Sequence, residues 1–172
     1  YFGLFILLGL SNYGNRTVAS VRENREKLSK TFCAIYGMQI IMGLLVILLY
    51  LIYIIYFSSN KTMAIIQLIY LLSVTLDINW FFWGRENFKL TVTRNIIIKI
   101  GIVFCILFYV KNSNDLWKYT MIVSIGDLIS HIVMWPFLLK EITFISVKFK
   151  NCLKHLKKIL LLFSPILANS IN

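Results

Sequence analysis

The chain has 172 residues, of which 59% are hydrophobic and only 15% are charged, and Lys and Arg outnumber Asp and Glu to give a net charge of +11 at pH 7. A soluble domain of this length cannot bury so much apolar surface. We therefore predict an all-α fold, a bundle of transmembrane helices, because only helices and closed barrels satisfy every backbone hydrogen bond in lipid. Nucleic acid is not an expected partner, since the basic residues mostly flank apolar runs.

Four apolar stretches are long enough to span a membrane as helices, for which about 20 residues suffice. They are residues 32–57, 62–83, 92–110 and 116–139. Shorter apolar stretches at residues 1–10 and 159–172 are expected to be the end of one spanning helix and the start of another. The chain is therefore expected to be an internal piece of a larger membrane protein. The remaining segments are predicted as connections, namely residues 11–31, 84–91, 111–115 and 140–158.

Basic residues are distributed unevenly among the successive connections. With residues 58–61 counted as the second of five connections, the first, third and fifth, taken with the adjoining helix ends, hold 15 of the 18 Lys and Arg residues. Because loops rich in Lys and Arg stay in the cytoplasm, we expect residues 11–31, 84–91 and 140–158 to be cytoplasmic and residues 111–115 to lie outside. The basic segments are also expected to contact anionic membrane lipids.

The first connection, residues 11–31, allows two interpretations. Ser20 and Glu23 have the spacing of a capping box at a helix start, and apolar residues recur at helical intervals between Val18 and Phe32. A short helix lying at the membrane interface and a solvated charged connector are both compatible with this pattern.

The third connection opens within the stretch DINWFFWGRENFK, which begins at Asp77. The aromatic run Trp80–Trp83 is expected to form an aromatic belt at the cytoplasmic headgroups. Gly84 fits the position just past a helix end, and Arg85 and Glu86 would then lie in water or among headgroups. A position at the cytoplasmic membrane boundary therefore accounts for these residues of the motif, but it does not account for Asp77.

Asp77 lies about two helical turns into the predicted membrane span, where a charge is costly. Two explanations remain open from the sequence. Asp77 could accept hydrogen bonds within the bundle, for example from Arg94 or Lys99 on the next helix, or it could face a cavity.

A polar stripe also runs along the fourth predicted span. The spacing places Thr120, Ser124, Asp127 and His131 on one helix face, and the four-residue step from Asp127 to His131 brings carboxylate and imidazole within reach of each other. Because an unpaired charge at the bilayer centre costs about 2.5–3.5 kcal/mol, something must offset Asp127. A hydrogen-bonded seam between helices and a substrate or proton site are the two alternatives.

The first two full spans carry similar polar stripes. On the first span the stripe contains Tyr36, Gln39, Gly43, Tyr50 and Tyr53. On the second span it contains Gln67, Tyr70, Ser73 and Asp77. Three striped helices predict a bundle around a hydrated interior, which a simple membrane anchor would not need.

Several motifs together resemble a known family. The stretch DINWFFWGRENFK, the downstream TRNIIIKI, the upstream YGNRTVASVRENREKLSKTF and the closing FSPILANSI are similar to the bacterial polysaccharide repeat-unit flippases. These are Wzx-type members of the multidrug/oligosaccharidyl-lipid/polysaccharide transporter superfamily. The resemblance implies a two-lobe transporter of twelve or more helices, of which this chain would form most of the N-terminal lobe.

The resemblance also implies a function and a location. Such proteins move an undecaprenyl-pyrophosphate-linked oligosaccharide across the bacterial cytoplasmic membrane by alternating access, for capsule, exopolysaccharide or O-antigen synthesis. The polysaccharide polymerase machinery would be a further partner. The family's motif positions correspond here to Asp77, Trp80, Gly84, Glu86, Arg94 and Lys99.

Alternative functions are a cation-coupled drug or metabolite exporter of the same superfamily, with Asp77 or Asp127 binding ions, and a polytopic enzyme of polysaccharide assembly. The chain has no Walker motif and no nucleophile–His arrangement, so a transporter is favoured over an enzyme. Its three cysteines lack CxxC spacing, and neither a cofactor nor a metal site is expected. The candidate substrate or ion pathway consists of Asp77, Arg94, Lys99, Asp127 and His131.

Overall fold

The computed structural model describes residues 2–7, 9–148 and 159, and every regular element in this part of the chain is helical. The elements are α1 (Phe2–Leu7), α2 (Leu10–Val21), α3 (Arg25–Tyr56), α4 (Lys61–Thr75), α5 (Asn79–Gly84), α6 (Phe88–Tyr109), the 3-10 turn η1 (Ser113–Asp115), α7 (Leu116–Ile132) and α8 (Trp135–Glu141). The predicted helix at residues 159–172 and the motif FSPILANSI lie almost wholly outside the described residues.

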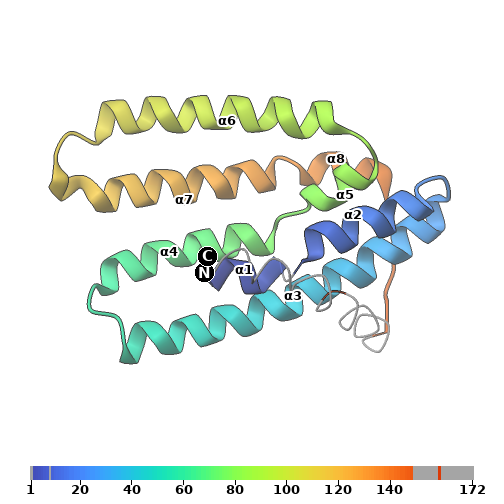
Figure 1. Cartoon of the computed structure of the whole chain (residues 1–172), viewed down its shortest axis with the longest axis horizontal. Coiled ribbons are helices and arrows are strands. Elements are labelled where there is room, and N and C mark those ends of the chain that lie inside the picture. Colours follow the sequence, from blue (N-terminus) through green and yellow to red (C-terminus); the bar gives the residue numbers. More distant parts are fainter. Residues whose placement is uncertain (1, 8, 149–158, 160–172) are drawn as a thin grey trace.

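The long helices stand side by side in the order α3, α4, α7, α6 (Figure 1). The short helix α1 packs against α3 and α4, and α2 packs against α3 and α5. The connections around residues 57–60 and 110–115 lie at one end of the bundle. The shorter helices α2, α5 and α8 gather at the other end, which we call the short-helix end.

Four segments are long and apolar enough to cross a membrane. They are Arg25–Tyr56, Lys61–Gly84, Phe88–Tyr109 and Ser113–Glu141, with mean hydropathies of 1.6 to 2.6. Their outward side chains are mostly apolar, and Leu48, Ile97 and Phe108 are each at least 60% exposed. Apolar exposure on this scale suits lipid and not water. The predicted fold class, a helical transmembrane bundle, is confirmed.

The predicted connection at residues 11–31 differs from the structure, which is helical over most of this stretch. Ser20 starts no helix: its hydroxyl donates to the carbonyl of Thr17, 2.7 Å away, within the last turns of α2. The residue that caps α3 is Asn24, whose side chain accepts a hydrogen bond of 2.9 Å from the backbone N–H of Lys27. Residues 11–31 therefore do contain a helix, α2, but α2 ends at Val21, where the capping box was expected to start a helix.

Two of the predicted spans are interrupted near the short-helix end. The second span stops at Thr75 and resumes at Asn79, which separates α4 from α5. The fourth span stops at Ile132 and resumes at Trp135. Pro136 lies in the first turn of α8, where its missing N–H leaves no helical hydrogen bond unmade. The break between α4 and α5 contains no proline or glycine that would interrupt a helix.

The aromatic run does not form the predicted belt. Trp80, Phe81 and Phe82 are all at most 1% exposed, and only Trp83 reaches the surface. The ring of Phe32 on α3 stacks on Trp80 and meets Phe81 edge-on, each at a centroid distance of 5.4 Å. The belt prediction is wrong because α5 is covered by α2 and by Phe32 of α3, so that its aromatic side chains fill the core of the short-helix end.

Gly84 is required for a reason other than the one predicted. It is the last residue of α5, and the left-handed backbone conformation falls on Glu86, with φ of 59°. A Cβ atom at Gly84 would lie 2.6 Å from the Cβ of Val18 and 2.7 Å from the carbonyl oxygen of Asn15, both on α2. Gly84 therefore lets α5 approach α2 closely, as small residues do between membrane helices.

Candidate functional site

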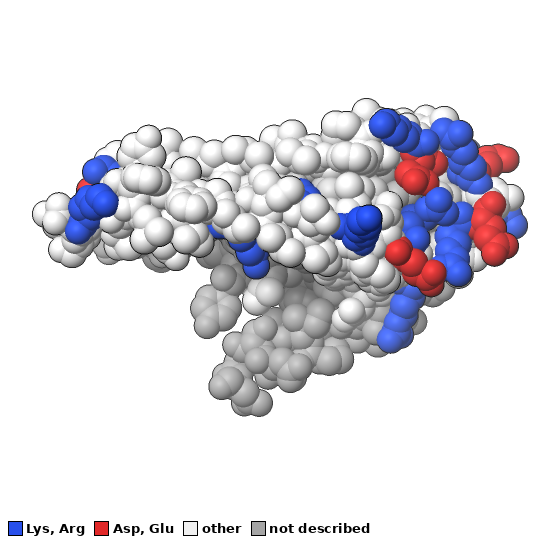
Figure 2. All heavy atoms as spheres, turned by 90° about the horizontal axis from the view of Figure 1, so that it is seen from above, with Lys and Arg blue, Asp and Glu red and all other residues white. Residues whose placement is uncertain are grey.

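Charged side chains gather at the short-helix end (Figure 2). Arg22 pairs with Glu86 at 2.5 Å, and Arg85 pairs with Glu141 at 2.8 Å. Arg85 also donates to the carbonyl of Arg22 at 2.7 Å. These pairs are partly exposed, so each adds at most about 1 kcal/mol to stability. Their arrangement shows that the motif residues Arg85 and Glu86 tie the end of α5 to α2 and α8.

The break between α4 and α5 is held by one side chain of α3. The amide nitrogen of Gln39 donates to the carbonyls of Val74, Thr75 and Asp77, at 3.2, 3.1 and 2.8 Å. Its amide oxygen accepts the indole N–H of Trp80 at 3.0 Å. Gln39 is fully buried. This single amide therefore supplies the hydrogen bonds that α4 loses by ending inside the bundle.

Asp77 lies in this break. One of its carboxylate oxygens accepts the backbone N–H of Asn79 at 2.8 Å, which caps the start of α5. The Nδ1 atom of His131 on α7 lies 3.4 Å from the same oxygen, without hydrogen-bond geometry. The partner expected for Asp77 was Arg94 or Lys99, but the structure brings His131 to it instead.

Arg94 does lie near this position, bound to other groups. It is only 6% exposed, and its guanidinium donates to the carbonyl of Ser130 at 2.5 Å and to the side-chain oxygen of Asn79 at 2.8 Å. Arg94 thereby joins α5, α6 and α7. Its two terminal nitrogens are engaged by the protein, so Arg94 acts here as a cross-link between helices.

Asp127 and Lys99 are less tightly held than the rest of the predicted pathway. Asp127 is half-buried on α7 and lies within electrostatic range of His131 and Lys99. The expected direct pair between Asp127 and His131 is not formed, because His131 turns toward Asp77. Lys99 is exposed on α6. Of the five predicted pathway residues, the structure thus brings Asp77 and His131 within 3.4 Å of each other and places Arg94 near them through its bond to Asn79.

Replacing Asn79 with leucine is expected to lower the free energy of unfolding by about 2 kcal/mol, because a hydrogen bond to the buried guanidinium of Arg94 is lost. The measurement is thermal or denaturant unfolding of the purified protein in detergent. Asn95→Leu is the matched control, since Asn95 is half-buried on α6 and makes no side-chain hydrogen bond within the described residues. Equal effects of the two substitutions would contradict the cross-linking role of Arg94.

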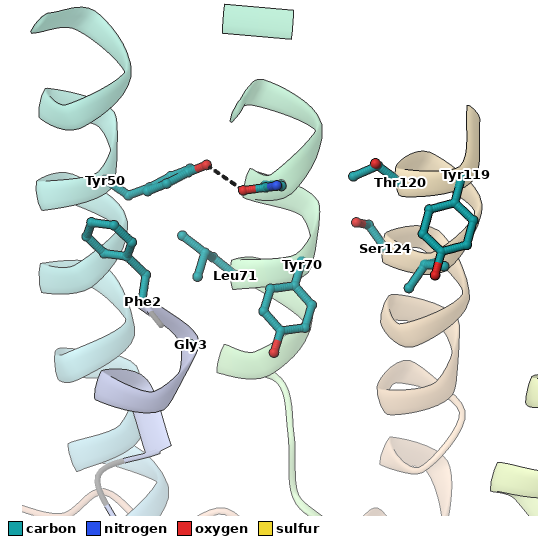
Figure 3. Close-up of a pocket in the computed structure, with 10 residues that line it drawn as sticks. Phe2, Gly3, Tyr50, Tyr70, Leu71, Tyr119, Thr120 and Ser124 are labelled. Carbon is teal, nitrogen blue, oxygen red and sulfur yellow. Dashed lines mark hydrogen bonds between the residues drawn. The ribbon is translucent and has the colours of Figure 1, made fainter. Parts of the chain in front are cut away.

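Toward the other end of the bundle the polar stripes open into a cavity of about 400 Å³. It is bounded by α1, α3, α4 and α7 (Figure 3). The stripe of α4 contributes Gln67 and Tyr70, and that of α7 contributes Thr120 and Ser124. Tyr50 of α3 donates to the Gln67 side-chain oxygen at 3.1 Å. The predicted polar faces of α3, α4 and α7 therefore meet. We call the line of polar side chains between α4 and α7 the polar seam: Asp77 and His131 lie close together at one end of it, and Gln67, Tyr70, Thr120 and Ser124 border the cavity at the other.

A bundle of apolar, membrane-length helices that carry polar side chains on their inner faces is a multi-pass membrane protein. The family described as "Polysaccharide biosynthesis protein" matches residues 1–171, and the chain belongs to this family. The match confirms the resemblance to Wzx-type transporters that the motifs carry. Members of the family are generally transporters. Comparisons with curated proteins and with solved structures gave no match.

Proposed function

We propose that this chain acts in a flippase that moves an undecaprenyl-pyrophosphate-linked oligosaccharide across the bacterial cytoplasmic membrane, for capsule, exopolysaccharide or O-antigen synthesis. The observation that carries the proposal is the polar seam between α4 and α7, which offers hydrogen-bonding groups within the span of the membrane. A hydrophilic oligosaccharide needs such a route, because unsatisfied polar groups in hydrocarbon cost several kcal/mol each. Family membership supports the same substrate class.

The charged residues have different roles in this proposal, some in orientation, one in substrate binding and one in structure. The short-helix end, with its Arg and Lys residues, faces the cytoplasm. The exposed ammonium group of Lys99 attracts the diphosphate, whereas Arg94 keeps α5, α6 and α7 in register. Alternating access then exposes the seam first to the cytoplasmic side and afterwards to the outer side.

Deletion of the intact gene that encodes this chain is expected to abolish surface polysaccharide and to make lipid-linked repeat units accumulate in the membrane. The measurements are immunoblotting of surface polymer and mass spectrometry of extracted lipids. Undiminished surface polymer in a strain without a second flippase would show that the proposal is wrong. If polymer persists and drug sensitivity rises instead, the exporter function is supported.

Complementation by variants of the full-length protein then tests Lys99. Lys99→Ala is expected to restore less surface polymer than the wild-type gene, because the diphosphate loses its cationic contact. Lys61→Ala is the matched control, since Lys61 is also exposed but lies at the opposite end of the bundle, at the start of α4. Equal restoration by both variants would remove Lys99 from the proposed pathway.

A further inference from the structure

The cavity of Figure 3 differs in chemistry from the break at Asp77. Among the described residues, its lining contains aromatic rings, hydroxyls and an amide but no acidic or basic side chain; these residues are Phe2, Gly3, Tyr50, Gln67, Tyr70, Leu71, Tyr119, Thr120, Val123 and Ser124. Its volume, about 400 Å³, falls in the range of small-molecule sites. An anionic ligand would find no counter-charge among these residues.

Two polar side chains of the lining carry hydrogen-bonding groups that no described residue uses. Ser124 is only 3% exposed, yet its hydroxyl makes no hydrogen bond to any described residue. Gln67 accepts the hydroxyl of Tyr50 through its oxygen, and its amide nitrogen, a donor, makes no hydrogen bond to a described residue. The side chains of Thr120 and Ser124 extend from α7 toward α4, and the hydroxyl of Thr120 donates within its own helix to the carbonyl of Leu116, at 2.9 Å. A hydrocarbon chain in this cavity would leave the Ser124 hydroxyl and the Gln67 amide nitrogen unsatisfied.

Aromatic rings form the other part of the lining. Tyr70 and Tyr119 are 42% and 45% exposed, so their rings are accessible to a ligand. The ring of Tyr70 packs over Gly3, where a Cβ atom would lie 3.1 Å from it. Aromatic faces carry partial negative charge, and the axial C–H groups of a sugar ring are weakly positive. Accessible rings beside unpaired hydroxyl and amide groups match the two kinds of surface that a sugar presents.

We propose that this cavity binds an uncharged sugar ring of the translocated oligosaccharide. Tyr119 and Tyr70 contact the C–H face of the ring, while Ser124 and Gln67 hydrogen-bond to its hydroxyls. The inference rests on the proposed flippase function and adds a separate subsite to it. The diphosphate and the glycan are then recognised at different places, the former through cations and the latter at this uncharged cavity.

The test measures binding of the oligosaccharide alone. The probe is the repeat unit released from the host's own lipid-linked intermediate, free of lipid and phosphate, and the full-length protein is held in lipid nanodiscs for calorimetry. Tyr119→Leu is expected to raise the Kd about tenfold through loss of a ring contact. Tyr119→Phe keeps the ring and is expected to bind like the wild type. Ser124→Val, which removes a hydroxyl and fills space, is expected to weaken binding as well.

Tyr56→Leu is the matched control, because Tyr56 is 75% exposed and lies outside the cavity. The proposal is overturned if the oligosaccharide does not bind, or if Tyr119→Leu and Ser124→Val leave the Kd at the control value. It is also overturned if undecaprenyl phosphate without sugar loses affinity in the same variants, since the cavity would then hold the lipid chain. The gene deletion tests the flippase function separately: loss of surface polymer together with unchanged Kd values would refute the sugar site alone.

Discussion

Replacing Gln39 with leucine is expected to lower the free energy of unfolding by about 3 kcal/mol. The amide of Gln39 serves three carbonyls at the break after α4 and the indole N–H of Trp80. Leucine has a similar volume but offers none of these hydrogen bonds, so buried donors and acceptors are left unsatisfied, at about 1–3 kcal/mol each. The break itself would then be poorly held, because no other side chain serves this set of carbonyls in the described part of the chain.

Unfolding followed by circular dichroism in detergent measures this effect. Gln67→Leu is the matched control, because it makes the same chemical change on an exposed residue whose oxygen accepts one hydrogen bond, from Tyr50. We expect the control to lower stability by less than about 1 kcal/mol. A Gln39→Leu variant as stable as the control would mean that Gln39 does not hold the break.

The substitution Gly84→Ala is expected to destabilise the protein by about 1–3 kcal/mol through overpacking. Its methyl group would lie 2.6 Å from the Cβ of Val18 and 2.7 Å from the backbone oxygen of Asn15. Neither atom belongs to a flexible side-chain end, so α5 must move away from α2. Trp80 would move with α5, and its ring already lies close enough to Gly14 that a Cβ there would come within 2.5 Å.

Gly101→Ala is the matched control, and it is expected to change stability in the opposite direction. Gly101 lies within α6, and a Cβ atom there meets nothing within 4 Å. Because alanine is favoured over glycine in helix interiors, we expect this control to raise stability by about 0.5–1 kcal/mol. Melting temperatures of the two variants in the same detergent should therefore shift in opposite directions, and a shift of both in one direction would contradict the packing argument.

The spans of the bundle were predictable because their cause is local. A run such as Phe32–Phe57 contains no charge, and lipid demands a helix of this length wherever such a run occurs. The polar faces of α4 and α7 were also predictable, since the helical period places Thr120 and Ser124 on one side. These faces meet at one cavity because α4 packs on α7, and the helical period of a sequence does not predict which helices pack together.

The interruption after Thr75 could not be predicted, since no proline or glycine marks it. Its cause is Gln39, which lies 36 residues earlier on another helix. The signal was a glutamine within an apolar span, and its partner could not be identified without the fold. His131 is a similar case: its helical spacing pointed to Asp127, whereas the packing of α4 on α7 brings Asp77, just after α4, within 3.4 Å of its Nδ1 atom.

The expectations for the aromatic run and for Gly84 failed for a common reason. Aromatics near a basic segment usually lie at the membrane surface, and glycine near a helix end usually relieves backbone strain. Here both Trp80 and Gly84 face α2, which covers one side of α5. The sequence of the motif does not reveal this cover, because α2 lies some 60 residues earlier in the chain.

The ionic asymmetry of the two ends also bears on how the molecule responds to voltage. In the proposed orientation Arg22, Arg25 and Arg85 lie on the negatively polarised cytoplasmic side, so turning the protein over would carry each guanidinium outward against the electric field. A potential of 100 mV opposes each such charge by about 2.3 kcal/mol. For the proposed orientation, the membrane potential therefore opposes inversion of the bundle, in addition to the barrier that hydrocarbon presents to ions.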